Sequence, residues 1–448
     1  MDLGEHLRVF SRKTFKPLLR KWKTRSPIIQ PTPRVPIEIT VEILEYLWEA
    51  YQQTVGNLLF HSQHGSRPFD DDSAKRTLYD ARLCLIRCAF VCRAWYEAGV
   101  PILYSHCVLL SSGQLSLFRR TLKSSPVLAQ TIKELSIVVE QVPSFRLATT
   151  SLPAAAKDII PILQSCTALQ SVFLSSPDTV FATSTSPVPA LRNLRSVTIH
   201  SLGPSSRTFT SNSFEHIEVL CLHFHSIESS VQVPHLPRVH TLKLRSTMWW
   251  PNFNPLTTML PARSLPSLRT LYMHWNGYTI PVTTPNIEFP EIQVVHLIGG
   301  KEVQSFATLT QNPTLSALRS LRHLFIGPLT SQDHPLGTWK FPHCFESLTV
   351  FMDLDQDASS LEPVLRCLAC NEREIQQRRM SLSKVVVNFY WHEYPPTEVE
   401  IEERVNVPFA AIQAMGIQLE YATELRLIDL DSWIIEHGEF VSQWPYRA

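Results

Sequence analysis

Residues 265–271 read Leu-Pro-Ser-Leu-Arg-Thr-Leu, and residues 318–324 read Leu-Arg-Ser-Leu-Arg-His-Leu. In both stretches a short turn leads into the pattern apolar-x-x-apolar-x-apolar, as in Leu268, Leu271 and Met273. Successive side chains of a strand point to opposite faces, so the last two apolar positions share one face. Each stretch therefore predicts a turn followed by a short strand that turns one side toward a core.

The pattern recurs along most of the chain. Between Val172 and Leu324 its central residues are separated by 25, 23, 22, 29, 24 and 29 positions. The copies are Ile132/Leu135/Ile137, Leu169/Val172/Leu174, Leu194/Val197/Ile199, Ile217/Leu220/Leu222, Val239/Leu242/Leu244, Leu268/Leu271/Met273, Ile292/Val295/Leu297 and Leu321/Leu324/Ile326, with weaker candidates at Phe345/Leu348/Val350, Leu382/Val385/Val387 and Leu425/Ile428/Leu430. This spacing resembles that of leucine-rich repeats, whose period is about 20 to 29 residues. One copy cannot bury its apolar face alone, so stacking stabilises the array. The usual asparagine after the strand is missing, and an irregular solenoid with a parallel sheet is expected.

A different pattern precedes the array. Residues 84–104 read CLIRCAFVCRAWYEAGVPILY, with Cys84, Cys88 and Cys92 at helical spacing, and a break is expected at Gly99-Val100-Pro101. Upstream, residues 35–39 read Val-Pro-Ile-Glu-Ile, and Ile43, Leu44 and Leu47 continue an apolar helical face. The two runs resemble the two halves of an F-box, in the type of F-box protein that is abundant in basidiomycete fungi. Val35 and Thr40 stand where that motif usually has leucine.

The F-box resemblance implies docking onto the Skp-type adaptor of a cullin–RING ubiquitin ligase. Such docking places apolar helical anchors in a groove of the partner. The residues to which the resemblance assigns it are Val35, Pro36, Ile39, Ile43, Leu44, Leu47, Leu85, Ile86, Val91 and Trp95. Some of these side chains must instead hold the helices together, and the sequence does not sort the two groups. Cys88 and Cys92 are interpreted as small core residues.

The fold class predicted is α+β or α/β, a small all-helical F-box module followed by an irregular leucine-rich-repeat-like solenoid. Residues 1–34 are interpreted as a basic, flexible leader, with contact to an anionic membrane or a targeting role as alternatives. Residues 35–108 form the helical module, with an inserted loop at 52–77, and residues 109–448 form the solenoid with a C-terminal cap. Within these parts, 111–126 is expected to be a linking helix and 362–380 a longer one.

The charge balance, the cysteines and the motifs that are missing from the sequence argue against several classes of protein. The 448 residues include 41 basic and 40 acidic side chains, a balance that argues against a bulk nucleic-acid binder. The nine cysteines show no disulfide framework, and no apolar run reaches the ~18 residues of a membrane span, so a cytoplasmic or nuclear protein is expected. Cys367-Leu368-Ala369-Cys370 has no second ligand pair, and no phosphate loop or nucleophile motif occurs. The chain is therefore expected to have no enzyme activity, metal or cofactor.

Two columns of side chains are expected on the concave side of the solenoid. One follows the third apolar position of each strand, and the other lies between the second and third positions. The residues proposed for target binding are Phe173, His200, His223, Lys243, Arg245, Tyr272, His274, His296 and Phe325. Aromatic and basic side chains are frequent at binding hot spots, and such a strip suits an acidic or phosphorylated segment. The alternative is a solvated sheet face, and Trp249 with Trp250 is a second candidate patch.

These features predict a non-catalytic substrate-recognition subunit of a Skp–cullin–F-box ubiquitin ligase. The F-box would dock the adaptor, and the repeat region would bind an unknown target protein. The alternative is an intracellular protein–protein interaction scaffold with no role in ubiquitylation.

Overall fold

The computed structural model describes most of the repeat region and parts of the helical region before it. The described residues are 39–49, 51, 80, 82–88, 91, 93–109, 112–137, 152–175, 192–202, 215–224, 235–246, 265–275, 291–299, 318–329, 341–353, 365, 368–377, 380–391 and 410–426. The leader 1–34, the inserted loop 52–77 and the pair Trp249–Trp250 lie outside them.

A single parallel sheet organises the described chain. Its 12 strands lie in sequence order, and every neighbouring pair is parallel. The strands are β1 (His106–Leu109), β2 (Glu134–Ile137), β3 (Ser171–Ser175), β4 (Ser196–Leu202), β5 (Val219–Phe224), β6 (Thr241–Ser246), β7 (Thr270–Trp275), β8 (Val294–Gly299), β9 (His323–Leu329), β10 (Ser347–Asp353), β11 (Lys384–Trp391) and β12 (Gln418–Arg426). The predicted parallel-sheet solenoid is confirmed.

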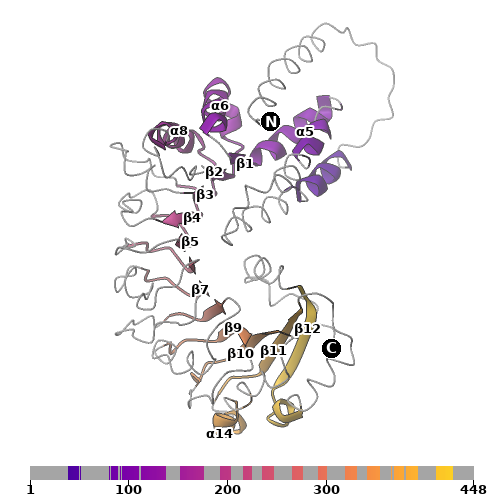
Figure 1. The fold of residues 1–448 in the computed structure, drawn as a ribbon, viewed down its shortest axis with the longest axis vertical. Helices are drawn as coiled ribbons and strands as arrows, with labels where there is room; N and C mark the ends of the chain where they lie inside the picture. The colour runs from indigo at the N-terminus through magenta and orange to yellow at the C-terminus, as the bar shows by residue number, and fades with distance from the viewer. Residues whose placement is uncertain are drawn as a thin grey trace, which may run out of the picture.

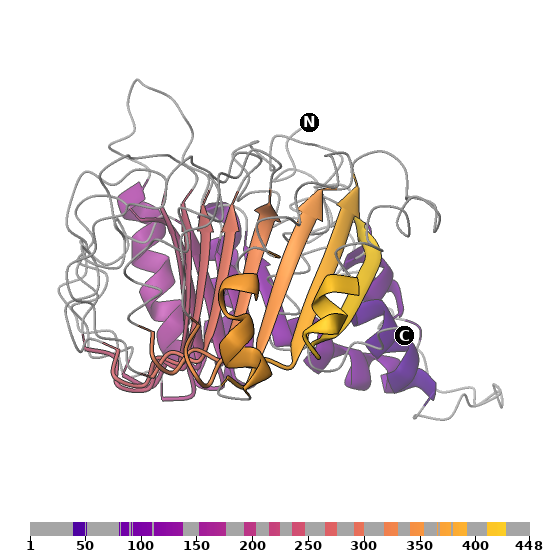
Figure 2. The ribbon, with the colours of Figure 1, turned by 90° about the horizontal axis from the view of Figure 1, so that it is seen from below.

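The strands follow an arc with helices at its N-terminal end (Figure 1). The labelled helices are α5 (Arg93–Ser105), α6 (Ser112–Ser124), α7 (Pro126–Ala129), α8 (Leu152–Ser165) and α14 (Glu372–Gln376). Residues 39–49, 82–88 and 410–414 are also helical. The guanidinium of Arg119 on α6 donates to Asp158 on α8 at 2.7 Å, which ties these two helices together. In the view along the sheet, α14 lies beside the strands of the C-terminal half (Figure 2).

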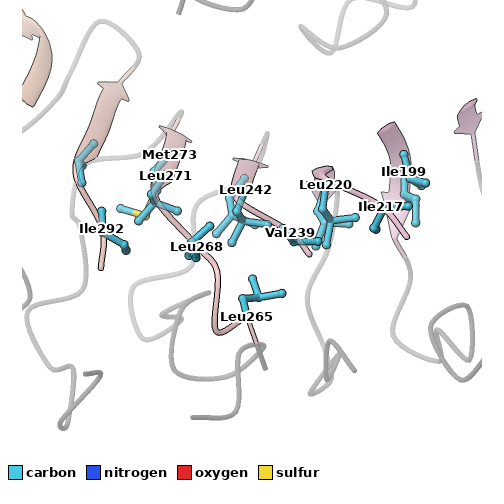
Figure 3. Close-up of a cluster of buried hydrophobic side chains, with 14 of the residues drawn as sticks. Ile199, Ile217, Leu220, Val239, Leu242, Leu265, Leu268, Leu271, Met273 and Ile292 are labelled. Carbon is cyan, nitrogen blue, oxygen red and sulfur yellow. The ribbon is translucent and has the colours of Figure 1, made fainter. Parts of the chain in front are cut away.

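The apolar repeat positions build one continuous core on the outer face of the sheet. Leu220, Leu242 and Leu271 occupy equivalent positions on adjoining strands, and all are buried in this core (Figure 3). Leu115 and Leu122 of α6 join it, as the linking-helix prediction requires. Burial of one such side chain contributes about 1.5 to 3 kcal/mol. Stacking of the repeats therefore supplies the stabilisation that a single repeat lacks.

The turns before the strands are joined by a regular backbone arrangement. Two successive N–H groups donate to one carbonyl of the preceding repeat: those of Arg269 and Thr270 both donate to the carbonyl of His240, at 2.9 Å each. The same arrangement recurs from the carbonyl of Lys133 to that of Arg322. These bonds pair polar backbone groups that stacking would otherwise leave without partners. The arrangement could not be predicted from the sequence, because it involves backbone groups and no side-chain motif accompanies it.

Two local predictions are wrong. The expected break at Gly99–Pro101 does not occur, since α5 continues through Pro101. The sheet begins three residues before the predicted boundary of 109, because β1 starts at His106 and pairs with β2. The strand β12 is Gln418–Arg426, with Leu419 opposite Val385. Ile428 and Leu430 of the weaker candidate lie outside the described residues.

The helix expected over 362–380 is interrupted. Asn371 forms a turn before α14 and is fully buried, and its side-chain oxygen accepts a hydrogen bond from the Phe341 N–H at 3.3 Å. This bond to a distant backbone group favours a turn, because asparagine readily leaves helical geometry to bond backbone.

The helical region packs directly on the first strand. The ring of Trp48 lies edge-on to His106 of β1 at 6.1 Å between centroids, and it also contacts Tyr51 at 5.2 Å. Leu85 is buried as well. The early helices and the sheet therefore share an apolar junction. No helix within the described ranges has both the length and the apolar character that a bilayer crossing needs.

Candidate interaction surfaces

The first helix of the described residues, 39–49, has apolar side chains on a buried side and on one exposed flank. Thr40 and Leu44 lie on the buried side, and Leu44 is only 1% exposed. Ile39, Ile43 and Tyr46 form a stripe on the exposed flank, where Ile43 is 39% and Tyr46 72% exposed. The spacing of four and three residues puts the three side chains on one helical face. We call these three residues the outer stripe.

Two further apolar side chains are exposed in the second part of the helical region. Val91 is 66% exposed, just after residues 82–88, and Tyr96 on α5 is 41% exposed. The Val91 N–H donates to the Cys88 carbonyl at 3.1 Å. A single exposed apolar side chain is ordinary on a protein surface, whereas a contiguous apolar patch marks an interaction surface. By themselves, Val91 and Tyr96 are therefore only two exposed apolar side chains.

The structure sorts the residues proposed for adaptor binding. Ile39, Ile43 and Val91 are exposed, and Leu47, Ile86 and Trp95 are half-buried. Leu44 and Leu85 are each 1% exposed, so their assignment to adaptor contact is wrong: they pack inside the helical region. Val35 and Pro36 lie outside the described residues. The sequence reasoning missed Tyr46, whose spacing from Ile43 and Ile39 was the available signal.

The predicted inner columns follow the strand register. Phe173, Thr198, Cys221, Lys243, Tyr272, His296 and Phe325 are paired in succession from β3 to β9. The second column pairs His223, Arg245 and His274 in the same way, whereas an irregularity after Ile199 shifts His200 out of direct register with His223. The side chains of the second column are outside what the structure describes.

Accessibility along the first column differs from the prediction. Phe173, Tyr272, His296 and Phe325 are buried, so the expectation that they stand open to solvent is wrong. Thr198, Cys221 and Lys243 are half-exposed. Target binding by this face stays a prediction, and in the first column it concerns chiefly the positions of the half-exposed residues Thr198, Cys221 and Lys243. We call the positions of Thr198, Cys221 and Lys243 the inner window.

The buried part of the inner column is a stack of rings. His296 lies 4.0 Å from Tyr272 and 3.9 Å from Phe325 between centroids, with interplanar angles of 13° and 6°. The Lys243 ammonium lies 4.9 Å from the centroid of the Tyr272 ring, a cation–π distance. Burial lowers the pKa of His296 well below its usual value, and the positive charges of Lys243 and His323 lower it further. The imidazole is therefore neutral at pH 7.

A second histidine, His106, is partly buried at the junction of the helical region and the sheet, with 10% of its side chain exposed. Nε2 of His106 is 3.2 Å from Ser136 Oγ, and Nδ1 is 3.2 Å from a carboxylate oxygen of Glu134. Burial lowers the pKa of His106 to about 4. Burial also raises the pKa of Glu134. The low pKa keeps the His106 imidazole neutral at pH 7, beside the Glu134 carboxylate and the Trp48 ring.

The described residues offer no metal centre. No group of three or more metal-ligating side chains occurs among them. Cys370 is half-buried, and its CxxC partner Cys367 lies outside the described residues. Burial raises the pKa of Cys107 and of Cys166 to about 12, which keeps both as thiols. Neither is poised as a nucleophile.

Comparison with known proteins leaves the family open. No protein-family model and no curated protein matches the chain.

Proposed function

We propose that this protein is a non-catalytic substrate receptor of a Skp–cullin–F-box ubiquitin ligase. The outer stripe supports the adaptor half of this proposal, because Ile39, Ile43 and Tyr46 stand exposed on one face of the first helix. An apolar helical stripe suits a partner groove that removes it from water. The F-box resemblance of the surrounding sequence supplies the identity of that partner.

The packing of the helical region adds a second argument. Because Trp48 contacts His106 of β1, the helix that carries the outer stripe is anchored to the first strand of the solenoid. A receptor built this way holds a bound target at a set distance from the adaptor. Transfer of ubiquitin then becomes effectively intramolecular, which is the contribution expected of a subunit without catalytic groups.

The adaptor contact is tested by placing charge on the outer stripe. Ile43→Asp with Tyr46→Asp should abolish co-purification with a Skp-type adaptor, because two carboxylates cannot enter an apolar groove without a large desolvation cost. The matched control is Leu117→Asp with Val127→Asp, which changes two exposed apolar side chains, 40% and 69% exposed, on α6 and α7. Adaptor binding by the control and not by the stripe variant supports the proposal.

Two outcomes count against the proposal. Retention of the adaptor by a folded stripe variant removes the outer stripe as its docking surface. A wild-type chain that binds no adaptor, or that binds it without shortening the lifetime of any co-purified protein in cells, favours the scaffold alternative instead.

A further inference from the structure

The inner face of the sheet is one-sided in charge from β3 to β9. Alternation along the strands and their register place these residues on it: Ser171, Phe173, Ser175, Ser196, Thr198, His200, Val219, Cys221, His223, Thr241, Lys243, Arg245, Thr270, Tyr272, His274, Val294, His296, Ile298, His323, Phe325 and Gly327. None of these residues is acidic, although the whole chain has 40 acidic and 41 basic residues. Lysine, arginine and histidine are the only ionisable groups among them apart from one cysteine and one tyrosine.

Only part of this face is accessible in its described side chains. The inner window is half-exposed, whereas Phe173 on one side and Tyr272 on the other are buried. Two residues beyond Cys221, Lys243 and Tyr272, the same face carries His223, Arg245 and His274, respectively. The four strands β4–β7 span about 14 Å at normal strand spacing. An extended segment of about four residues covers that width.

We infer that the inner face of β4–β7 binds a carboxylate-rich segment of a target protein, about four acidic residues long. This inference rests on the proposed function for the role of the target, and on charge complementarity for its chemistry. Lys243 supplies a cation whose ammonium is already held over the Tyr272 ring at 4.9 Å. A cation held in place by a ring loses less side-chain entropy when it pairs with a carboxylate. Among the residues that the register places on this face of β4–β7, none is acidic. Described carboxylates lie beside the listed residues at the two ends, where Glu134 pairs in register with Ser171 and Glu346 lies 3.7 Å from His323.

The test measures binding of the full chain to fluorescein-labelled decapeptides by anisotropy. One peptide carries four consecutive glutamates, and its partner carries glutamines at those positions. The glutamate peptide should bind about tenfold more tightly, as expected from several exposed ion pairs together. Lys243→Gln with Arg245→Gln should remove that difference. The matched control, Arg269→Gln, alters an exposed arginine in the turn before β7 and should leave it in place.

Three results of this experiment would overturn the inference, and one would extend it. Equal binding of the two peptides overturns it, and so does an equal loss of glutamate binding in Arg269→Gln. A single-stranded DNA oligonucleotide that binds more tightly than the peptide and displaces it also overturns it, because the face then serves nucleic acid. Tighter binding of a peptide with two phosphoserines in place of two glutamates supports an anionic segment and identifies phosphorylation as a source of the charge.

The same variants separate this inference from the proposed function. Lys243→Gln with Arg245→Gln should keep adaptor binding and its thermal midpoint, which shows that the chain is folded. If the wild-type chain binds the glutamate peptide but no Skp-type adaptor, the receptor proposal is overturned and the inner face remains a binding site for an acidic segment. The reverse result overturns the inference alone.

Discussion

Replacing His296 with phenylalanine should make the stability of the protein less sensitive to acid. The imidazole is 1% exposed and lies between Tyr272 and Phe325 in the ring stack. Its Nε2 atom is buried without a hydrogen-bond partner, a state that costs about 1 to 3 kcal/mol. A phenyl ring removes this cost but is larger, and overpacking costs about as much. At pH 7 the two effects offset, so the pH dependence is the decisive quantity.

The sign follows from the pKa of the buried ring. Burial, Lys243 and His323 all lower the pKa of His296 in the folded protein below 6.5. As the pH falls through 6.5, the unfolded chain therefore binds a proton that the folded chain does not. Stability is fully present above pH 6.5 and is lost below it, at about 1.4 kcal/mol per pH unit. For a ring that stays neutral in the folded protein to pH 5, the loss from pH 7 to pH 5 is about 2 kcal/mol.

Urea unfolding at pH 7 and pH 5, followed by tryptophan fluorescence and circular dichroism, measures this loss. His296→Phe should lose about 2 kcal/mol less stability on acidification than the wild type. Phe325→Leu is the control, because it disturbs the same stack without removing a titratable group, and it should lower stability similarly at both pH values. An equal acid loss in wild type and His296→Phe would refute the reasoning, since the ring would then be protonated or solvated in the folded state.

Three further predictions follow from single sites. Leu220→Ala, in the continuous core, should cost about 2 to 5 kcal/mol in urea unfolding, and a cost below about 1 kcal/mol would mean that the outer core is loosely packed. Gly416→Ala should cost about 1 to 2 kcal/mol, because Gly416 has φ +75° and no atom lies within 4 Å of an added Cβ; Gly416→Asn should cost less, and an equal cost would point to sterics instead of backbone strain. Burial raises the pKa of Cys107 and of Cys166 to about 12, so both thiols should resist iodoacetamide at pH 8 in the native protein, while the exposed Cys84 reacts. If peptide mapping finds Cys107 labelled in the native protein, that result would contradict its burial.

The repeat region was predictable because its signal is local. Alternation within a strand fixes which residues face the core, and Leu242 and Leu244 lie there as the pattern requires. The register of neighbouring copies follows from the same residues, since Leu242 pairs with both Leu220 and Leu271. A slip of one residue would turn every apolar side chain away from the core. The apolar pattern therefore determines both the strands and their alignment.

Boundaries were less predictable, because they depend on competition between local preferences and packing. Gly99 and Pro101 both disfavour a helix interior, yet α5 passes through them and continues to Ser105. Gly99 is buried, so packing of the helical region against β1 outweighs the local preference. The early start of the sheet at His106 has the same origin, since that residue meets Trp48 across the junction.

Exposure of the candidate surfaces could not be read from periodicity, since a pattern gives the face of a residue and not what covers that face. Phe325 and Lys243 share the inner face, yet Phe325 is buried and Lys243 is half-exposed. The first helix shows the converse. Its sequence has apolar residues on a buried side and on one exposed flank, and its packing uses only the side of Leu44. Glu42 and Glu49 lie opposite Leu44 and are exposed, as expected of a helix that packs on a core, while Ile39, Ile43 and Tyr46 occupy the flank between these two sides. Ile39, Ile43 and Tyr46 are exposed on that flank and are not used by the core, and the proposed adaptor contact rests on this observation.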